Sequence, residues 1–218
     1  MLIISNYKYN KLHVSKVNCI ELSDLRVRFV LEIETNTKIE NSSVLVVMKN
    51  PSKATTYQSD KTINNVIENL HSQYNKIYIV NLYPYYSSNA KGLVSFFDCA
   101  DNKTILEIND YYIEKYEQLA NDILIGWGTN TIGIKNNEYD GRISTVMNLL
   151  RKNNKPMYYV HCCKCKNNMT GCGNNTNCST RCKKRCKRSI VTKSKSCSII
   201  RYPMHLELWD TQKKKLRY

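Results

Sequence analysis

Short apolar runs alternate with helix-like segments between Val44 and Tyr159, and this alternation limits the chain to few folds. The runs VLVVM, KIYIVNL, ILIGWG and PMYYV are typical of buried strands, because they are short and apolar and are bounded by polar segments. Strands separated by helices of this length run parallel and place helices on both faces of a sheet. We therefore predict an α/β three-layer sandwich with a central, mostly parallel sheet.

Three helices are expected, at about 60–75, 109–122 and 139–152, each with its apolar residues on one face. Asp60 precedes the first helix and is a suitable N-cap residue. The three apolar faces comprise Ile63, Val66, Ile67, Leu70 and Tyr74, then Tyr112, Ile113, Tyr116, Leu119 and Ala120, then Ile143, Val146, Met147 and Leu150. The first 43 residues add a strand or hairpin, and the alternation in RFVLEIE suggests an edge strand with one wet face.

The pattern breaks at 161–197, where eight cysteines and ten Lys or Arg occur without any Asp or Glu. This stretch lacks the apolar periodicity needed to fold by burial, so we expect a cysteine-rich basic insert (161–197) in one α/β domain formed by 1–160 and 198–218. The cysteine spacing permits zinc binding, with unliganded thiols, disulfides or a disordered basic loop as alternatives. The candidate zinc ligands are Cys162, Cys165, Cys172, Cys178, Cys182 and Cys186.

The charge is strongly positive, with 33 Lys and Arg against 18 Asp and Glu and a formal net charge of +15. Such an excess favours a polyanionic partner, here DNA, although solubility alone is the simpler reading. The basic residues that we expect to contact phosphate in the insert are Arg181, Lys183, Lys184, Arg185, Lys187 and Arg188. The sequence has no apolar run of membrane-spanning length and no signal-peptide pattern, so we expect no membrane partner and a cytoplasmic location.

Polar and aromatic residues follow the predicted strands at Asn50-Pro51-Ser52, Asn81-Leu82-Tyr83 and Trp127-Gly128-Thr129, and again at Tyr202-Pro203-Met204-His205. Ligands of open parallel sheets bind beyond the carboxyl ends of the strands. If the sheet is as predicted, all four segments surround one cleft.

The series VVMKNPSKA, SDKTINNVI, IVNLYPYYSSNAKGL, ILIGWG and RYPMHL resembles a phage- and bacterium-associated family of domains of unknown function. The likeness runs from about Val44 to Leu206, without the insert. That family is in turn similar to the uracil-DNA glycosylase superfamily. The resemblance implies a uracil-DNA-glycosylase-like fold and an enzyme that extrudes a DNA base and hydrolyses its N-glycosidic bond, leaving an abasic site. The phage association implies a role in anti-phage defence, with hypermodified phage DNA as substrate.

The resemblance also assigns roles to residues. Asn50 falls where the superfamily orients the attacking water, and Asn81 where an amide reads the flipped base. Ser52 replaces a tyrosine that blocks C5 of the pyrimidine, which implies a C5-modified pyrimidine as substrate. Tyr83 and Trp127 would lie against the base, and Lys49 and Lys53 would extend the DNA-binding surface. Tyr202 stands where the superfamily has a catalytic histidine, and His205 is the residue that can replace it.

Two other readings remain open. The chain can be a non-catalytic glycosylase mimic that binds DNA or a glycosylase-inhibitor protein, a reading that Tyr202 favours. It can also be a basic zinc protein with an unrelated α/β core, in which case Asn50 and Asn81 would lie far apart. Asn50 can simply cap its turn, as Asn before Pro often does, and His205 can be a structural histidine.

Overall fold

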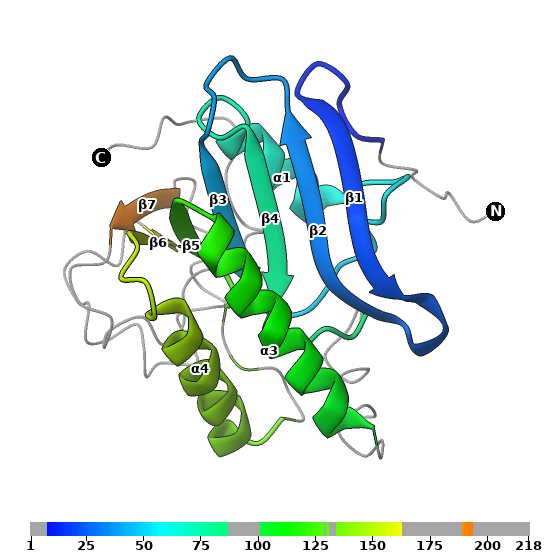
Figure 1. Cartoon of the computed structure of the whole chain (residues 1–218), viewed down its shortest axis with the longest axis vertical. Coiled ribbons are helices and arrows are strands. Elements are labelled where there is room, and N and C mark those ends of the chain that lie inside the picture. Colours follow the sequence, from blue (N-terminus) through cyan, green and yellow to red (C-terminus); the bar gives the residue numbers. More distant parts are fainter. Residues whose placement is uncertain (1–7, 87–100, 129, 131–133, 163–188, 194–218) are drawn as a thin grey trace.

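A computed structural model describes residues 8–86, 101–128, 130, 134–162 and 189–193 (Figure 1). The strands are β1 (Val14–Leu22), β2 (Val27–Thr35), β3 (Ser43–Met48), β4 (Lys76–Asn81), β5 (Asp122–Ile125), β6 (Met157–Cys162) and β7 (Ser189–Lys193). The helices are α1 (Lys61–Leu70), α3 (Asn102–Leu119) and α4 (Asn136–Leu150). Among the residues described, no helix is both long and apolar enough to cross a lipid bilayer.

The seven strands form one sheet in the order β1-β2-β4-β3-β5-β6-β7. Strands β4, β3, β5 and β6 run parallel, while β1, β2 and β7 add antiparallel pairings at the two sides. This arrangement confirms the predicted α/β architecture with a parallel centre. The parallel pairing follows from the helical crossovers, because a chain must return across the sheet before it can add a parallel strand.

The helices cover both faces of the sheet, which gives three layers (Figure 1). Helix α1 packs on one face, in a core cluster with apolar residues such as Leu31, Val46 and Ile79. Helices α3 and α4 pack on the opposite face, in a second cluster that includes Val47 and Val80. Successive residues of β3 and β4 alternate between the two clusters, because side chains of a strand point to opposite faces in turn.

Strand β3 is the central strand of the seven-stranded sheet, and hydrogen bonds from its first residue, Ser43, connect it to Asn121, just before β5. The backbone N–H and the hydroxyl of Ser43 each donate to Asn121 Oδ1 at 2.8 Å, across 78 residues of chain. The Ser43 carbonyl in turn accepts from Asn121 N at 3.0 Å. These bonds set the register in which β5 joins β3.

Helix α1 begins as predicted, because Asp60 Oδ1 accepts a hydrogen bond from Ile63 N at 2.9 Å. The apolar faces predicted for α1 and α4 are buried. Helix α3 differs in two ways: it begins at Asn102, and Leu119, expected on its buried face, is 54% exposed. Glu117 is fully buried instead, since Asn153 and Lys155 provide polar contacts there.

The prediction that RFVLEIE forms an edge strand is wrong. The segment belongs to β2, which lies between β1 and β4 and is buried along most of its length. Strand β1 occupies the edge and pairs antiparallel with β2. The alternation in RFVLEIE reflects only the second half of β2, where Glu32 and Glu34 are partly exposed.

Strand β7 lies within the 161–197 range that the sequence marks as an insert. It pairs antiparallel with β6, from Tyr158 opposite Lys193 to Cys162 opposite Ser189. This strand was not predicted. Five residues of the basic segment therefore extend the sheet next to β6.

Candidate functional site

The carboxyl ends of β3, β4 and β5 meet at one edge of the sheet. The backbone of Lys49 accepts from Tyr83 N at 2.9 Å, and the backbone of Val47 accepts from Gly126 N at 2.9 Å. The chain continues from β3 to β4 on one side and later adds β5 on the other side, so its direction of winding reverses at β3. Ligand sites of open α/β sheets lie at such a reversal, beyond the carboxyl ends.

Asn81 ends β4 at this edge and has no exposed surface. Neither its Oδ1 nor its Nδ2 has a hydrogen-bond partner. Strand alternation places the side chain on the α1 face, beside Met48, its register partner in β3. A buried amide without partners costs about 1–3 kcal/mol relative to a paired one, so its presence calls for a functional explanation.

The loop after β3 lies next to Asn81, because Asn50 follows two residues after Met48. Asn50 Nδ2 donates to the carbonyl of Pro51 at 3.1 Å, which helps to hold the turn. The hydroxyl oxygen of Ser52 is buried and has no hydrogen-bond partner. The loop is fixed to the start of α1, since Ala54 N donates to Asp60 Oδ2 at 3.0 Å. The structure thus brings Asn50, Ser52 and Asn81 to one edge.

Arg28, at the start of β2, reaches the same loop and was not predicted as a site residue. Its side chain is fully buried, and Nη1 donates to the carbonyl of Ala54 at 2.6 Å. Its Nε and Nη2 have no hydrogen-bond partner, and no carboxylate of the described residues lies within 4.0 Å. A guanidinium stays charged in proteins, so an unpaired buried one is a candidate anion-binding group.

The groups in direct contact with Arg28 are neutral, and the carboxylates of Glu21 and Asp60 lie one contact further away. Its guanidinium carbon lies 5.6 Å from the centre of the Tyr86 ring. The Tyr86 hydroxyl donates to Glu21 Oε2 at 2.7 Å, and burial raises the pKa of this tyrosine. Burial also raises the pKa of Cys19 to about 12, although the charge of Arg28 opposes the shift. The Arg28 cation is therefore in direct contact with a ring and a carbonyl, and its Nε and Nη2 remain available to an anion.

The family comparison covers this region. A family model described as "Protein of unknown function (DUF1643)" matches residues 28–172. The chain belongs to the DUF1643 family. No curated protein matches the chain, and no solved structure does. The DUF1643 match begins at Arg28 and includes Asn50, Ser52 and Asn81, whereas Tyr202 and His205 lie beyond it.

Three other predicted residues of the DUF1643 domain lie on the opposite face. Tyr83 and Trp127 are buried in the cluster covered by α3 and α4. Tyr83 faces Tyr139 of α4, with 6.4 Å between ring centres. Lys49 is on this side too, since its Nζ lies 5.8 Å from the Tyr139 ring centre. The structure thus places Tyr83, Trp127 and Lys49 at the predicted edge but not beside the Asn81 amide.

Helix α4 fixes the strand ends on that face. Arg142 Nε donates to the carbonyl of Leu82 at 2.6 Å, and its Nη2 lies 2.6 Å from Asp110 Oδ1. The hydroxyl of Tyr139 donates to the carbonyl of Gly128 at 3.1 Å. Gly128 has a φ of 73°, a left-handed conformation that glycine adopts without strain, and it turns the chain after β5.

The remaining predicted residues are only partly covered by the structure. Lys53 is exposed next to the Asn50 loop, and Cys162 ends β6. Outside the described residues lie Tyr202, His205, Arg181, Lys183, Lys184, Arg185, Lys187, Arg188, Cys165, Cys172, Cys178, Cys182 and Cys186. Zinc binding by the insert stays a prediction. The roles of Tyr202 and His205 in catalysis stay predictions as well.

Proposed function

We propose that this protein is a DNA base glycosylase with a uracil-DNA-glycosylase-like fold. It binds an extruded pyrimidine at Asn81 and hydrolyses the N-glycosidic bond to leave an abasic site. The observation that carries the proposal is the buried Asn81 amide, whose Oδ1 and Nδ2 both lack partners at the carboxyl end of β4. A pyrimidine edge offers the matching donor and acceptor.

Specificity for a base follows from the same burial. A site built around a desolvated amide discriminates strongly against a base that cannot pair with it, because the mispaired amide stays unsatisfied. Since Asn81 has no exposed surface, an extruded base reaches it only after part of the covering chain moves. Closure over the base would then exclude water from the base-pairing edge.

Ser52 supports a substrate with a substituent at C5. Its side chain is small, and its buried hydroxyl has no partner in the loop after β3. A hydroxyl can both donate to and accept from a hydroxymethyl group. We therefore propose C5-modified pyrimidines of phage DNA as substrates and anti-phage defence as the biological role.

The chemistry assigned to the site needs a positioned water and a stabilised leaving group. Asn50 orients the water, whose oxygen bonds to C1′ of the sugar while the N-glycosidic electron pair leaves with the base. The base then takes up the proton that the water loses. Arg28 supplies a fixed positive charge near the departing base anion. Tyr202, which stands in the place of the superfamily's histidine, carries no such charge. Because an amide is a poor general base, the reaction is expected to be slow.

A second candidate function is binding without cleavage. It is favoured by the bond from Asn50 Nδ2 to the Pro51 carbonyl, which gives this amide a structural role in its own turn. In this reading the protein binds DNA, or a glycosylase-inhibitor protein, through the same surface.

The decisive experiment compares amide variants on defined DNA. Duplexes that contain uracil, 5-hydroxymethylcytosine or its glucosylated form are incubated with the full chain and then treated with alkali, which breaks strands at abasic sites. We expect Asn81→Leu to abolish breakage and to raise the free energy of unfolding by roughly 1–3 kcal/mol, because an unsatisfied amide is removed. Asn69→Leu is the matched control, since Asn69 is also buried but donates to the Asn65 carbonyl at 2.8 Å.

The outcomes separate the two functions. Breakage that persists in Asn81→Leu would place the reaction elsewhere. Intact DNA on every substrate, with binding that depends on Asn81, would favour the non-catalytic protein.

A further inference from the structure

A second cluster of chemically active side chains lies at the opposite edge of the sheet. His13 immediately precedes β1, Glu68 lies in α1 and His71 is the C-cap residue of α1. The start of β1 pairs with the end of β2, at Thr35, whose N–H donates to the Asn75 carbonyl just before β4. The cluster therefore lies at the amino ends of the parallel strands, away from Asn81.

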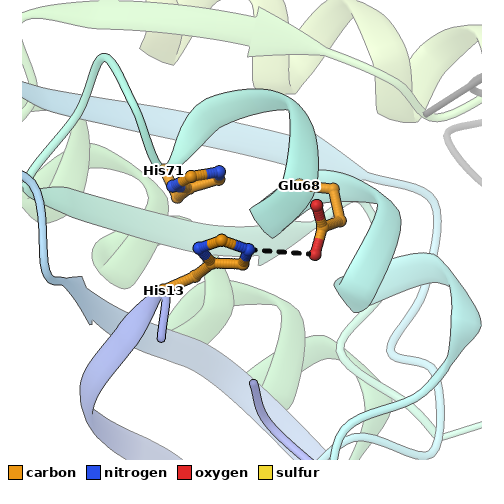
Figure 2. A group of neighbouring side chains, drawn as sticks. All are labelled: His13, Glu68 and His71. Atoms are coloured by element: carbon orange, nitrogen blue, oxygen red, sulfur yellow. Dashed lines mark ion pairs between the residues drawn. The ribbon is translucent and has the colours of Figure 1, made fainter. Parts of the chain in front are cut away.

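The three side chains converge on one another (Figure 2). One ligand atom from each residue lies within 4.8 Å of the other two, and His13 Nε2 lies 3.4 Å from Glu68 Oε1. Adjacent ligand atoms on a tetrahedral zinc ion are about 3.3 Å apart, given metal–ligand distances near 2.0–2.1 Å. The His13–Glu68 pair already has this spacing. The His71 ring must tilt out of its stack on His13, because an ion lies in the plane of each imidazole that binds it.

The two imidazole rings are stacked, with 3.8 Å between their centres and 25° between their planes. Such closeness disfavours two protonated rings, since their positive charges would repel each other. Burial and the nearby His13 lower the pKa of His71, which favours the neutral form that coordinates metals. Apart from the His13–Glu68 contact, neither ring bonds to another side chain in the part of the chain that the structure describes.

We propose that His13, Glu68 and His71 bind one divalent transition-metal ion, with zinc the best fit. Two imidazoles and one carboxylate form a ligand set that zinc uses in proteins, and water fills the remaining position. The partial exposure of His13 and Glu68 leaves room for that water. The ion would fasten the segment before the edge strand β1 to the end of α1, so its role is to stabilise the sheet edge.

Metal binding is measured on the full chain, with Zn²⁺ and Co²⁺ as the probes. At a free Zn²⁺ concentration 100 times the dissociation constant, we expect the melting temperature to rise by about 5–10 °C, an increase that Glu68→Gln and His71→Asn abolish. Glu107→Gln is the matched control, because Glu107 is an exposed helical glutamate whose side chain lies 4.0 Å from Lys103.

Cobalt separates this site from the cysteines of the insert. Each variant should bind one Co²⁺ fewer than the wild type while its thiolate-to-cobalt absorption is unchanged. The proposal is overturned if Glu68→Gln, folded as judged by its metal-free melting temperature, binds as many ions as the wild type. Glu68 is 42% exposed, so its substitution leaves the fold intact and decides the question even if His71→Asn does not fold.

Discussion

Arg28 has no exposed surface, and Nε and Nη2 of its guanidinium have no hydrogen-bond partner. A buried charge of this kind lowers stability, because no carboxylate of the described residues pairs with it directly to offset its desolvation. Residues that lower stability in this way are characteristic of functional sites. Substitution of Arg28 therefore tests directly whether this residue stabilises the fold or binds a ligand.

We expect Arg28→Met to leave the free energy of unfolding unchanged within about 1 kcal/mol, or to raise it, since methionine fills similar space without charge. DNA binding should weaken at the same time. Urea denaturation measures the first effect and fluorescence anisotropy with a labelled duplex the second. A large loss of stability with unchanged DNA binding would make Arg28 a purely structural residue.

Cys19 should be inert at neutral pH. Burial, the largest influence, raises its pKa from 9.0 to about 12, so at pH 8 its thiolate fraction is about a thousandfold below that of an ordinary thiol. We expect alkylation by iodoacetamide, followed by peptide mass spectrometry, to label Cys19 only in strong alkali. Because the folded pKa is the higher one, this thiol favours the folded state below pH 9 and loses that contribution as the pH rises towards 12.

The sequence predicted the edge of the sheet at which Asn50 and Asn81 meet, because strand order and polar strand ends are visible in it. It did not predict the face on which each side chain lies. Tyr83 and Trp127 follow the same strands but point into the other core cluster. Arg28 was missed because the alternation in RFVLEIE appeared to leave one face wet, whereas β2 is covered on both sides.

At the scale of elements, Lys155 stabilises the end of α3. Its Nζ donates to the carbonyls of Gln118 at 2.8 Å, Ala120 at 2.6 Å and Glu117, and it lies 4.0 Å from Glu117 Oε1. A cation at a helix C-terminus is favourable, and the Glu117 carboxylate is fully buried beside it. This arrangement explains why a glutamate lies inside where the periodicity favoured Leu119.

Lys155→Met should lower the free energy of unfolding by about 3 kcal/mol, because it leaves the Glu117 carboxylate buried without its cation. Lys152→Met is the control. Lys152 lies 2.6 Å from Glu114, but that pair is exposed, so its loss should cost less than about 1 kcal/mol. Guanidinium denaturation of the two variants measures both changes, and equal losses would show that Glu117 does not depend on Lys155.

The sequence predicted which helices form better than it predicted where each helix begins. The start of α1 could be predicted because Asp60 is a typical N-cap residue, and its side chain does cap the helix. Helix α3 begins at Asn102, seven residues before the predicted start, because its first turns contain few apolar residues to mark a face. Strand β7 is too short to show an alternation of apolar residues in the sequence, so it was not predicted. Its pairing with β6 stabilises it as a strand.

At the scale of the whole molecule, about half of the net positive charge comes from one stretch of the sequence. Residues 163–188 contain eight Lys or Arg and no Asp or Glu, so replacing them with a short neutral linker lowers the formal charge from +15 to +7. We expect this deletion to keep the melting temperature of the α/β domain, since β7 begins after it, at Ser189. The dependence of DNA affinity on salt concentration should become much shallower, because fewer phosphates are neutralised.

A matched deletion of 163–193 tests the sheet edge separately. It removes β7 as well and exposes the backbone of β6, so its stability should fall and its tendency to aggregate should rise. Equal stability of the two deletions would mean that β7 adds nothing to the sheet. An unchanged salt dependence in the shorter deletion would contradict DNA contact by the basic segment.

The central position of β3 has a consequence for the chain while it is being made. Its partner β4 follows about 33 residues later, the separation between Ser42 and Asn75, which are hydrogen-bonded. The strand on its other side, β5, follows 78 residues later, the separation between the hydrogen-bonded Ser43 and Asn121. At a synthesis rate of about 5–20 residues per second, the edge of β3 that pairs with β5 stays unpaired for roughly 4–16 s after β3 is made. That edge belongs to a strand of almost purely apolar residues. The nascent chain is therefore most exposed to misassociation in the interval between α1 and β5, before the second half of the sheet is available.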